Sequence, residues 1–237
     1  MAGAVSSKPK VAQKPVRKGP SKLTKTYLLA YNVVQTLGWS YLLYQLVSHY
    51  LPGNTKPLWD TVWWTVMIFQ NAAVLEIVHA AAGMVQSSIM TTLLQVYSRV
   101  FLVCAVLLTS RGAVESAGLP LSLFAWCVTE IVRYSFYAFN LLGSVPYILQ
   151  YLRYTLFYAL YPIGITGELW CMYVQQNEVA TSGMWSYAMP NRFNFIFNYR
   201  YFLIAYMLSY VPIFPLLFMH MMNQRKKVLG GGDKKTK

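Results

Sequence analysis

Charged residues are scarce in this chain of 237 residues, and acidic residues are the scarcest. Asp, Glu, Lys and Arg together make up 11% of the sequence, with 7 acidic residues against 20 basic ones. Apolar residues make up 56%, and the mean hydropathy is +0.38. This composition excludes a disordered chain and a coiled coil, because both carry far more charge. It is also too apolar for an ordinary soluble domain.

The basic excess lies at the two ends of the chain. Residues 1–26 contain seven basic residues and no acidic one, and residues 225–237 contain six basic residues and one acidic one. These ends carry +7 and +5, so they account for +12 of the net charge of +13. The body between them is nearly neutral and strongly apolar. This distribution argues against a nucleic-acid partner and favours contact with membrane lipid.

Cysteine, histidine and glycine patterns exclude several kinds of site. Cys104, Cys127 and Cys171 stand singly in apolar stretches, so we expect core residues rather than a metal site or a disulfide framework. The three histidines are isolated, and no glycine-rich nucleotide motif is present. The sequence therefore predicts neither a metal nor a cofactor. No internal repeat supports a transporter built from inverted repeats.

Long apolar runs dominate the body. A bilayer core about 30 Å thick requires roughly 20 apolar residues in a helix. Six segments meet this length, with turn signals between them. They predict an all-α, polytopic membrane protein with six transmembrane helices in one bundle and disordered basic tails. The bundle forms one catalytic domain over 27–222, between tails 1–26 and 223–237. The predicted spans are 27–49, 60–82, 88–110, 120–142, 148–174 and 199–222.

The orientation follows from the number of spans and from the tail charges. An even number of spans places both tails on one side, and the positive-inside rule places basic tails in the cytosol. The first 26 residues are expected to form a cytosolic arm rather than a cleavable signal peptide. The final Lys234-Lys235-Thr236-Lys237 is similar to a dilysine retrieval signal of the endoplasmic reticulum. A solvated run of charge is the alternative interpretation.

Several ionisable residues fall within predicted spans, where each costs at least a few kcal/mol unless it has a partner or a function. Gln95 precedes Arg99 by four residues, as Thr129 precedes Arg133, so polar faces point inward on more than one helix. The alternative is that these residues only join helices through hydrogen bonds. The ionisable residues are Glu76, Arg99, Glu130, Arg133, Arg153 and Glu168.

The fifth predicted span carries the strongest sign of chemistry. Tyr161 and Glu168 are seven residues apart, so their side chains lie on one stripe, separated by roughly 10.5 Å along a regular helix. Pro162, Gly164 and Gly167 accompany them, and we expect either a kink or a close approach of the backbone to a substrate that brings the two groups to one site. A carboxyl group and a phenol can act as an acid–base pair for β-elimination next to a carbonyl, without a metal or redox cofactor.

These residues occur in motifs that resemble those of a known family, the very-long-chain (3R)-3-hydroxyacyl-CoA dehydratases of the endoplasmic reticulum, also called protein-tyrosine-phosphatase-like proteins. The resemblance covers roughly residues 25 to 222, and the plant Pasticcino-type members are expected to be closest. The motifs are Leu75-Glu-Ile-Val-His79 with Gly83, Gln95-Val-Tyr-Ser-Arg99, the segment Trp126 to Tyr137, Leu152-Arg-Tyr-Thr155, the segment Tyr161 to Glu168, Met189-Pro-Asn191 and Asn194 to Tyr199.

The resemblance implies a function for the acid–base pair. Members of the family dehydrate 3-hydroxyacyl-CoA to trans-2-enoyl-CoA in the third step of fatty-acid elongation, which implies Tyr161 and Glu168 as the catalytic pair. The preferred assignment makes Glu168 the base at C2 and Tyr161 the donor to the 3-hydroxyl, with the reverse assignment open. The implied partners are the acyl-CoA substrate, membrane lipid, and the condensing enzyme and two reductases of the elongase.

The remaining polar residues of the spans have two interpretations. Arg99, Arg133 and Arg153 form a positive funnel for the phosphates of coenzyme A, or they simply pair with Glu76 and Glu130. Gln95 and Gly164 complete the expected polar network or substrate-binding site.

A phosphatase is the rival hypothesis. Cys127 and Arg133 have the Cys-x5-Arg spacing of a phosphatase loop, but the glycines of that loop are missing and the stretch reads as a continuous helix. A scaffold that binds phosphoproteins without catalysis is a further alternative. A dehydration assay on the purified protein separates the scaffold from the enzyme.

Overall fold

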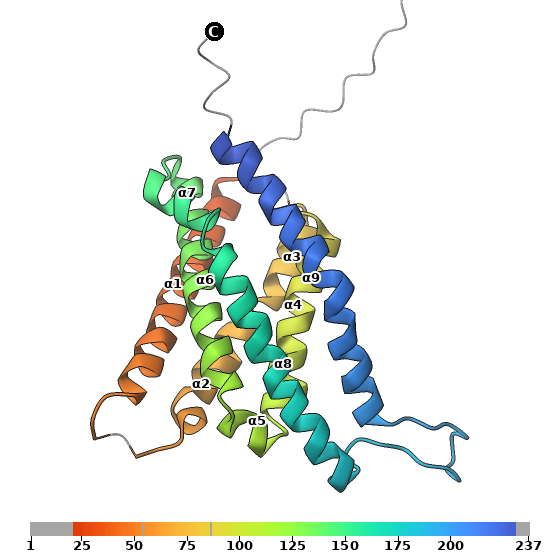
Figure 1. The fold of residues 1–237 in the computed structure, drawn as a ribbon. Coiled ribbons are helices and arrows are strands. Elements are labelled where there is room, and N and C mark those ends of the chain that lie inside the picture. The colour runs from red at the N-terminus through yellow and green to blue at the C-terminus, as the bar shows by residue number, and fades with distance from the viewer. Residues whose placement is uncertain (1–20, 54, 86, 231–237) are drawn as a thin grey trace, which may run out of the picture.

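The structure is a computed structural model that describes residues 21–53, 55–85 and 87–230. Its helices run alongside one another in a single bundle (Figure 1), which confirms the predicted all-α class. Within the described residues, the only strand-like pairing is an isolated bridge between Tyr187 and Phe197. The expected disorder of the tails and the dilysine-type signal at Lys234 to Lys237 concern residues that lie mostly outside the described part of the chain.

Helix α1 (Lys22–His49) begins where the Ser21 side chain accepts a hydrogen bond from the backbone N–H of Thr24. It starts five residues earlier than the predicted span at 27, because lysine and threonine do not oppose helix formation outside an apolar run. The second predicted span is two helices, α2 (Leu58–Ala72) and α3 (Val74–Ala81), which meet at Ala73.

The third predicted span also changes form along its length. Helix α4 (Ile89–Phe101) continues into the π-helix η1 (Leu102–Leu107), and α5 (Arg111–Glu115) follows as a short helix. The carbonyl of Ala105 in η1 accepts hydrogen bonds from the Gln175 amide at 2.7 Å and the Tyr199 hydroxyl at 2.9 Å. Two other helices therefore support the wider turn of η1.

Helix α6 (Gly118–Leu142) is the centre of the bundle. It packs against α1 along one side and against α8 along another. Helix α6 ends at Gly143, whose φ of 93° is in the left-handed region that glycine adopts easily.

The fifth predicted span, 148–174, is divided. A short α7 (Tyr147–Arg153) and a long α8 (Phe157–Ser182) are separated by residues 154–156. The apolar run continues through these three residues, so hydropathy gives no sign of the break. Helix α8 continues beyond 174 until Gly183, which has a φ of 63°.

Helix α9 (Tyr199–Leu229) packs on α8. It extends seven residues past the predicted end at 222, because Gln224 and the basic residues that follow favour a helix even though they are polar. The C-terminal end of α9 and helix α7 lie at the same end of the bundle (Figure 1).

Three helical stretches of the described chain are long and apolar enough to cross a membrane: Leu58–Ala81, Ile89–Leu107 and Tyr199–Leu229. Helices α1, α6 and α8 contain 28, 25 and 26 residues, which is also long enough. Polar residues lower their mean hydropathy.

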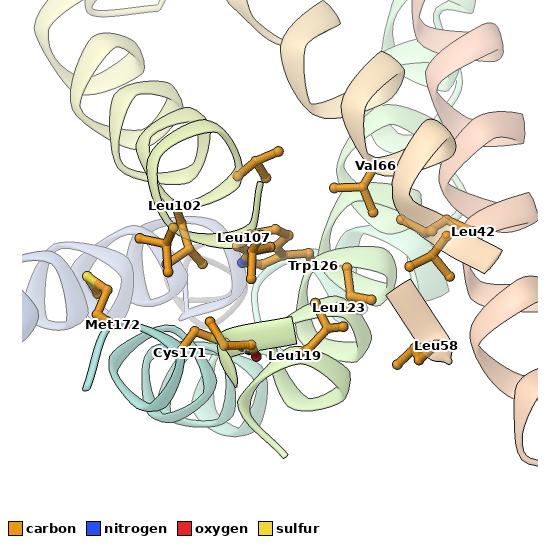
Figure 2. Packing of buried hydrophobic residues seen from close by; sticks show 14 of the residues in the cluster. Leu42, Leu58, Val66, Leu102, Leu107, Leu119, Leu123, Trp126, Cys171 and Met172 are labelled. Atoms are coloured by element: carbon orange, nitrogen blue, oxygen red, sulfur yellow. Dashed lines mark hydrogen bonds between the residues drawn. The ribbon is translucent and has the colours of Figure 1, made fainter. Parts of the chain in front are cut away.

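A packed hydrophobic core joins α1, α2, η1, α6 and α8 (Figure 2). Side chains of α6 lie between those of α1 and α2 on one side and those of η1 and α8 on the other. Cys127 and Cys171 are completely buried in this core, as the sequence predicted, and Cys104 is half-buried. The core includes Trp39, Leu42, Val62, Val66, Leu102, Leu107, Leu119, Leu123, Trp126 and Met172.

Candidate active site

A cavity of about 560 Å³ is lined by helices α3, α4, α6, α7, α8 and α9, with Trp39 of α1 and Gln70 of α2. All nine residues singled out from the sequence line it, although they come from five different helices. The polar faces of these helices therefore meet at one interior space. The nine residues are Glu76, Gln95, Arg99, Glu130, Arg133, Arg153, Tyr161, Gly164 and Glu168.

Glu168 is held at the cavity by two neutral donors. Its side chain is buried, with 7% of the residue exposed. The indole N–H of Trp126 donates to Oε1 at 2.9 Å, and the hydroxyl of Tyr210 donates to Oε2 at 2.9 Å. Helices α6 and α9 thus each hold one oxygen of a carboxyl group that belongs to α8.

Gly167 lets α8 approach α6 closely enough for the hydrogen bond from Trp126 to Glu168. A Cβ atom on Gly167 would lie 2.5 Å from Oγ of Ser122 and 2.7 Å from the carbonyl oxygen of Gly118. A Cβ atom on Gly164 would meet only the Cβ atom of Ala125, at 3.3 Å. The close contact at Gly167 sets the distance between the two helices one residue before Glu168.

Tyr161 lies two turns before Glu168 and is half-buried. Its ring stacks on Phe214, with centroids 5.0 Å apart and an interplanar angle of 11°. Among the described residues, none forms a hydrogen bond with its hydroxyl. This hydroxyl is therefore available to a ligand.

Tyr161 and Glu168 lie on one unbroken helix. Helix α8 is continuous from Phe157 to Ser182, with Pro162 inside it, and the break in the span precedes Tyr161. The two groups face one cavity, and α9 contacts both of them. Tyr210 binds Glu168, and Phe214, one turn later, stacks on Tyr161.

Four charged side chains of α3, α4 and α6 form one network. Glu130, which is 2% exposed, accepts hydrogen bonds from Arg99 and from Nε of Arg133, the latter at 2.7 Å. Arg133 also binds both oxygens of Glu76, at 2.5 and 2.8 Å, and Tyr134 donates a further hydrogen bond to Glu76. Bidentate contacts of this kind fix geometry as well as charge.

The pairing interpretation is therefore correct for Arg99 and Arg133, and these two do not form the free positive funnel. Arg153 differs, since no carboxylate within the described residues pairs with it. Its guanidinium lies over the rings of Phe136 and Tyr137, at 4.4 and 4.6 Å from their centroids.

Gln95 and His79 lie in different surroundings. Gln95 lines the cavity one turn before Arg99, as expected from their shared helical face. His79 is buried, and its Nε2 lies 2.9 Å from the hydroxyl of Tyr27.

The phosphatase hypothesis does not fit the structure. Cys127 is completely buried within α6, and the chain from Cys127 to Arg133 is continuous helix rather than a loop. Arg133 is bound to two carboxylates, so it cannot hold a phosphate in this arrangement.

Sequence analysis did not identify Trp126, Tyr210 or Phe214 as part of the site. Trp126 stood in a quoted motif but resembled a packing residue. Tyr210 and Phe214 are four residues apart on the last span, a spacing that places them on one face, yet many aromatic residues share that pattern. No group of three or more His, Cys, Asp or Glu side chains in the described part of the chain has an arrangement that could hold a metal ion.

The chain matches the family model described as "Protein tyrosine phosphatase-like protein, PTPLA" over residues 70–231. It is 49% identical to very-long-chain (3R)-3-hydroxyacyl-CoA dehydratase hpo-8 of Caenorhabditis elegans over 213 residues, which cover 89% of this chain and 98% of the relative. It is 44% identical to very-long-chain (3R)-3-hydroxyacyl-CoA dehydratase 2 of Mus musculus over 222 residues, covering 93% and 87%.

The plant relative is less similar. Very-long-chain (3R)-3-hydroxyacyl-CoA dehydratase PASTICCINO 2 of Arabidopsis thaliana is 38% identical over 211 residues, which cover 88% of this chain and 95% of the relative. The family resemblance, which includes the plant Pasticcino-type members, is confirmed, and this plant relative is less similar to the chain than the two animal relatives above. No solved structure matches the chain. The family model and the relatives agree, and the chain belongs to the protein tyrosine phosphatase-like (PTPLA) family, together with the very-long-chain (3R)-3-hydroxyacyl-CoA dehydratases.

Proposed function

We propose that this protein dehydrates a very-long-chain (3R)-3-hydroxyacyl-CoA to the trans-2-enoyl-CoA, with Tyr161 and Glu168 as the catalytic pair. One observation carries the proposal. Glu76, Glu130 and Glu168 all line the cavity, but within the described residues Glu168 alone of these three has no salt bridge. A carboxylate held by neutral donors keeps its capacity to accept a proton, whereas arginine neutralises the other two.

In the proposed reaction, Glu168 removes a proton from C2, next to the thioester carbonyl. The electrons of that C–H bond form the C2–C3 double bond as the C3–O bond breaks. The hydroxyl of Tyr161 gives its proton to the departing oxygen, which leaves as water. The proton on Glu168 then returns to the Tyr161 phenolate, directly or through water, so the enzyme ends in its starting state.

The surroundings of the two groups support these roles. The donors Trp126 and Tyr210 each bind one oxygen of Glu168 and so hold the carboxyl group in one orientation at the cavity. The Tyr161 hydroxyl has no competing hydrogen bond from the described residues. The opposite assignment, with Tyr161 as the base, is the alternative that the experiment below separates.

The cavity also offers an apolar path for a long acyl chain. Its walls combine the polar residues described above with apolar side chains from α4, α6, α8 and α9. These include Leu94, Val132, Leu160, Ile213, Phe214 and Leu217. An apolar lining with a few convergent polar groups is typical of a small-molecule site.

We further propose six membrane spans, with both tails cytosolic and the protein in the endoplasmic reticulum membrane. Helices α1, α6 and α8 are each longer than the roughly 20 residues that a span requires. The basic ends of the sequence support the orientation. In this setting the reaction is the third step of fatty-acid elongation, beside the condensing enzyme and the two reductases.

The experiment uses purified full-length protein in detergent with a very-long-chain 3-hydroxyacyl-CoA. We expect the wild type to release enoyl-CoA, and Tyr161→Phe and Glu168→Gln each to lower kcat by at least about a hundredfold. Tyr173→Phe and Glu115→Gln, which change exposed side chains, serve as controls and should retain activity. A fully active Tyr161→Phe protein would contradict both role assignments, and an inactive wild type would favour the scaffold hypothesis.

A second substrate distinguishes the acid from the base. A 3-chloroacyl-CoA eliminates chloride, which needs no proton to leave. If Tyr161 is the acid, this substrate restores much of the rate of Tyr161→Phe but not that of Glu168→Gln. The opposite pattern of rescue would reverse the two roles.

A further inference from the structure

The cavity extends from Glu168 to one end of the bundle. Leu152 and Arg153 line it there from the end of α7, and His220, Met221 and Gln224 line it from the C-terminal part of α9. These two elements lie at the same end in Figure 1. We call this part of the cavity the mouth.

Arg153 is held in place at the mouth but its charge is not neutralised there. Its guanidinium lies over the rings of Phe136 and Tyr137, and its Nη2 donates to the hydroxyl of Tyr137 at 3.2 Å. The other terminal nitrogen, Nη1, is buried and has no hydrogen-bond partner in the described part of the chain. A buried donor without a partner is costly, and a bound ligand can supply the missing acceptor.

Arg225 on α9 lies beside the residues that line the mouth and, like Arg153, contacts an aromatic ring and has a buried nitrogen without a hydrogen bond. It directly follows Gln224, which lines the cavity, and its guanidinium lies 5.4 Å from the ring centroid of Tyr158 on α8. Its Nε atom is buried and makes no hydrogen bond with any described residue. The guanidinium of Arg153 also lies 5.8 Å from the ring centroid of Tyr154, in the short break between α7 and α8, and Tyr158, which Arg225 contacts, is in the first turn of α8. Both arginines therefore contact aromatic rings close to this break.

No acidic residue occurs in α7 or α9, and neither arginine is in a salt bridge formed by described residues. The contrast with Arg99 and Arg133 is clear, because carboxylates neutralise those two. The mouth therefore has a positive potential that attracts an anion.

The separation between the mouth and the reacting groups suggests which anion. From Phe157, at the start of α8, the helix rises roughly 6 Å to Tyr161 and roughly 17 Å to Glu168. A thioester placed at Tyr161 and Glu168 thus lies well inside the cavity, and an extended pantetheine arm is needed to connect it to a group at the mouth.

We propose that Arg153 and Arg225 together bind the phosphate groups of coenzyme A at the mouth of the cavity. Arginine matches phosphate oxygens with two parallel donors, and rings that already hold the guanidinium reduce the entropy lost on binding. The thioester end then points inward and the acyl chain lies among the apolar helices. This inference rests on the proposed dehydratase function and names the part of the substrate that the mouth recognises.

The test compares two substrates with the same very-long 3-hydroxyacyl chain. One is the CoA thioester, and the other is the N-acetylcysteamine thioester, which has no nucleotide and no phosphate. Arg153→Gln and Arg225→Gln are prepared as full-length proteins in a detergent free of phospholipid. Arg111→Gln is the matched control, because Arg111 is 92% exposed and pairs with Glu115 outside the cavity.

We expect Arg153→Gln and Arg225→Gln each to lower kcat/KM for the CoA thioester about tenfold to a hundredfold. For the N-acetylcysteamine thioester, kcat/KM should stay within about twofold of wild type. Increasing salt should lower kcat/KM of the wild type for the CoA thioester only. The control should behave as wild type with both substrates.

Three outcomes would overturn the inference. The first is an unchanged kcat/KM in both variants. The second is an equal loss of kcat/KM for both substrates, as a purely structural role or a role in binding lipid headgroups predicts. The third is a salt effect of the same size for both substrates. If Arg153→Gln does not fold, Arg225→Gln decides by the same criteria. Failure of the proposed function is a different result, because the wild type would then dehydrate neither substrate.

Discussion

The hydroxyl of Tyr210 on α9 lies 2.9 Å from Oε2 of Glu168 on α8 and donates a hydrogen bond to it. Because Phe214, one turn later on α9, stacks on Tyr161, a single helix face orders both members of the proposed catalytic pair. Helix α9 contacts chiefly α8, so this face is its main attachment to the bundle.

Replacing Tyr210 with Phe removes the donor and keeps the ring. We expect kcat to fall about tenfold to a hundredfold while KM changes little, because Tyr210 fixes the position of Glu168 and a misplaced catalytic group loses rate steeply. Steady-state kinetics on purified protein measure both. Tyr173→Phe removes an exposed hydroxyl from α8 and should have no effect. An unchanged kcat in Tyr210→Phe would show that the bond to Glu168 does not assist catalysis.

Trp126 and Trp39 form a natural pair for comparison. Each is 1% exposed, but the N–H of Trp126 binds Glu168, whereas the Trp39 N–H has no hydrogen-bond partner among the described residues. Both Phe variants lose a similar part of a buried ring, but Trp126→Phe should lose more stability, because it also loses a hydrogen bond and Trp39→Phe removes a donor that had none. We expect Trp126→Phe to lower kcat at least about tenfold more than Trp39→Phe, because only the former loses a bond to the carboxylate. Equal losses in kcat would reduce the role of Trp126 to packing.

Gly167 and Gly164 are expected to respond differently to a methyl group. In Gly167→Ala the new Cβ atom would lie within 2.7 Å of Ser122 and Gly118, so α8 must move away from α6. We expect a loss of at least about 1–3 kcal/mol in unfolding free energy. Gly164→Ala should lose less, because its nearest contact is 3.3 Å. Thermal unfolding in detergent compares them, and a reversed order would contradict the packing argument.

Glu130 and Glu115 are both paired with arginine but differ in burial. In Glu130→Gln, Arg99 and Arg133 lose their shared carboxylate inside the bundle, so we expect a loss of about 3–5 kcal/mol in unfolding free energy. Glu115→Gln changes a pair at 3.5 Å whose side chains are 92% and 65% exposed, and should change stability little. Chemical denaturation of the two variants tests this difference. Similar stabilities would mean that the buried network does not hold the helices together.

The sequence was sufficient to predict the helical class and the inward-facing polar side of each helix, since both depend on periodicity within one helix. It left open whether Arg133 pairs with Glu76 and Glu130 or faces the substrate, because such a contact depends on the rotation of one helix against another. Trp126 and Tyr210 were missed for a related reason. An aromatic residue that packs and one that donates to a carboxylate have the same pattern along the chain.

The break at residues 154–156 was not predicted because the apolar run passes through it unchanged. Pro162 does not interrupt α8, because one missing hydrogen bond near the start of the helix leaves its other hydrogen bonds in place. Helix ends also differed from the predicted spans, since α1 and α9 extend into polar sequence that hydropathy does not count.

The charge network has a consequence for how the protein is made. Helix α3 contributes an anion and α4 a cation, while α6 supplies one of each. The charges of α3 and α4 cancel in sum, but each of these two helices has its salt-bridge partner on α6. Glu76 receives its arginine from a position 57 residues later in synthesis. While only the first half of the chain has been synthesised, Glu76 on α3 and Arg99 on α4 are therefore without their partners on α6. Placing either helix alone in lipid then costs free energy. We expect α3 and α4 to enter the lipid together, after α6 has been synthesised.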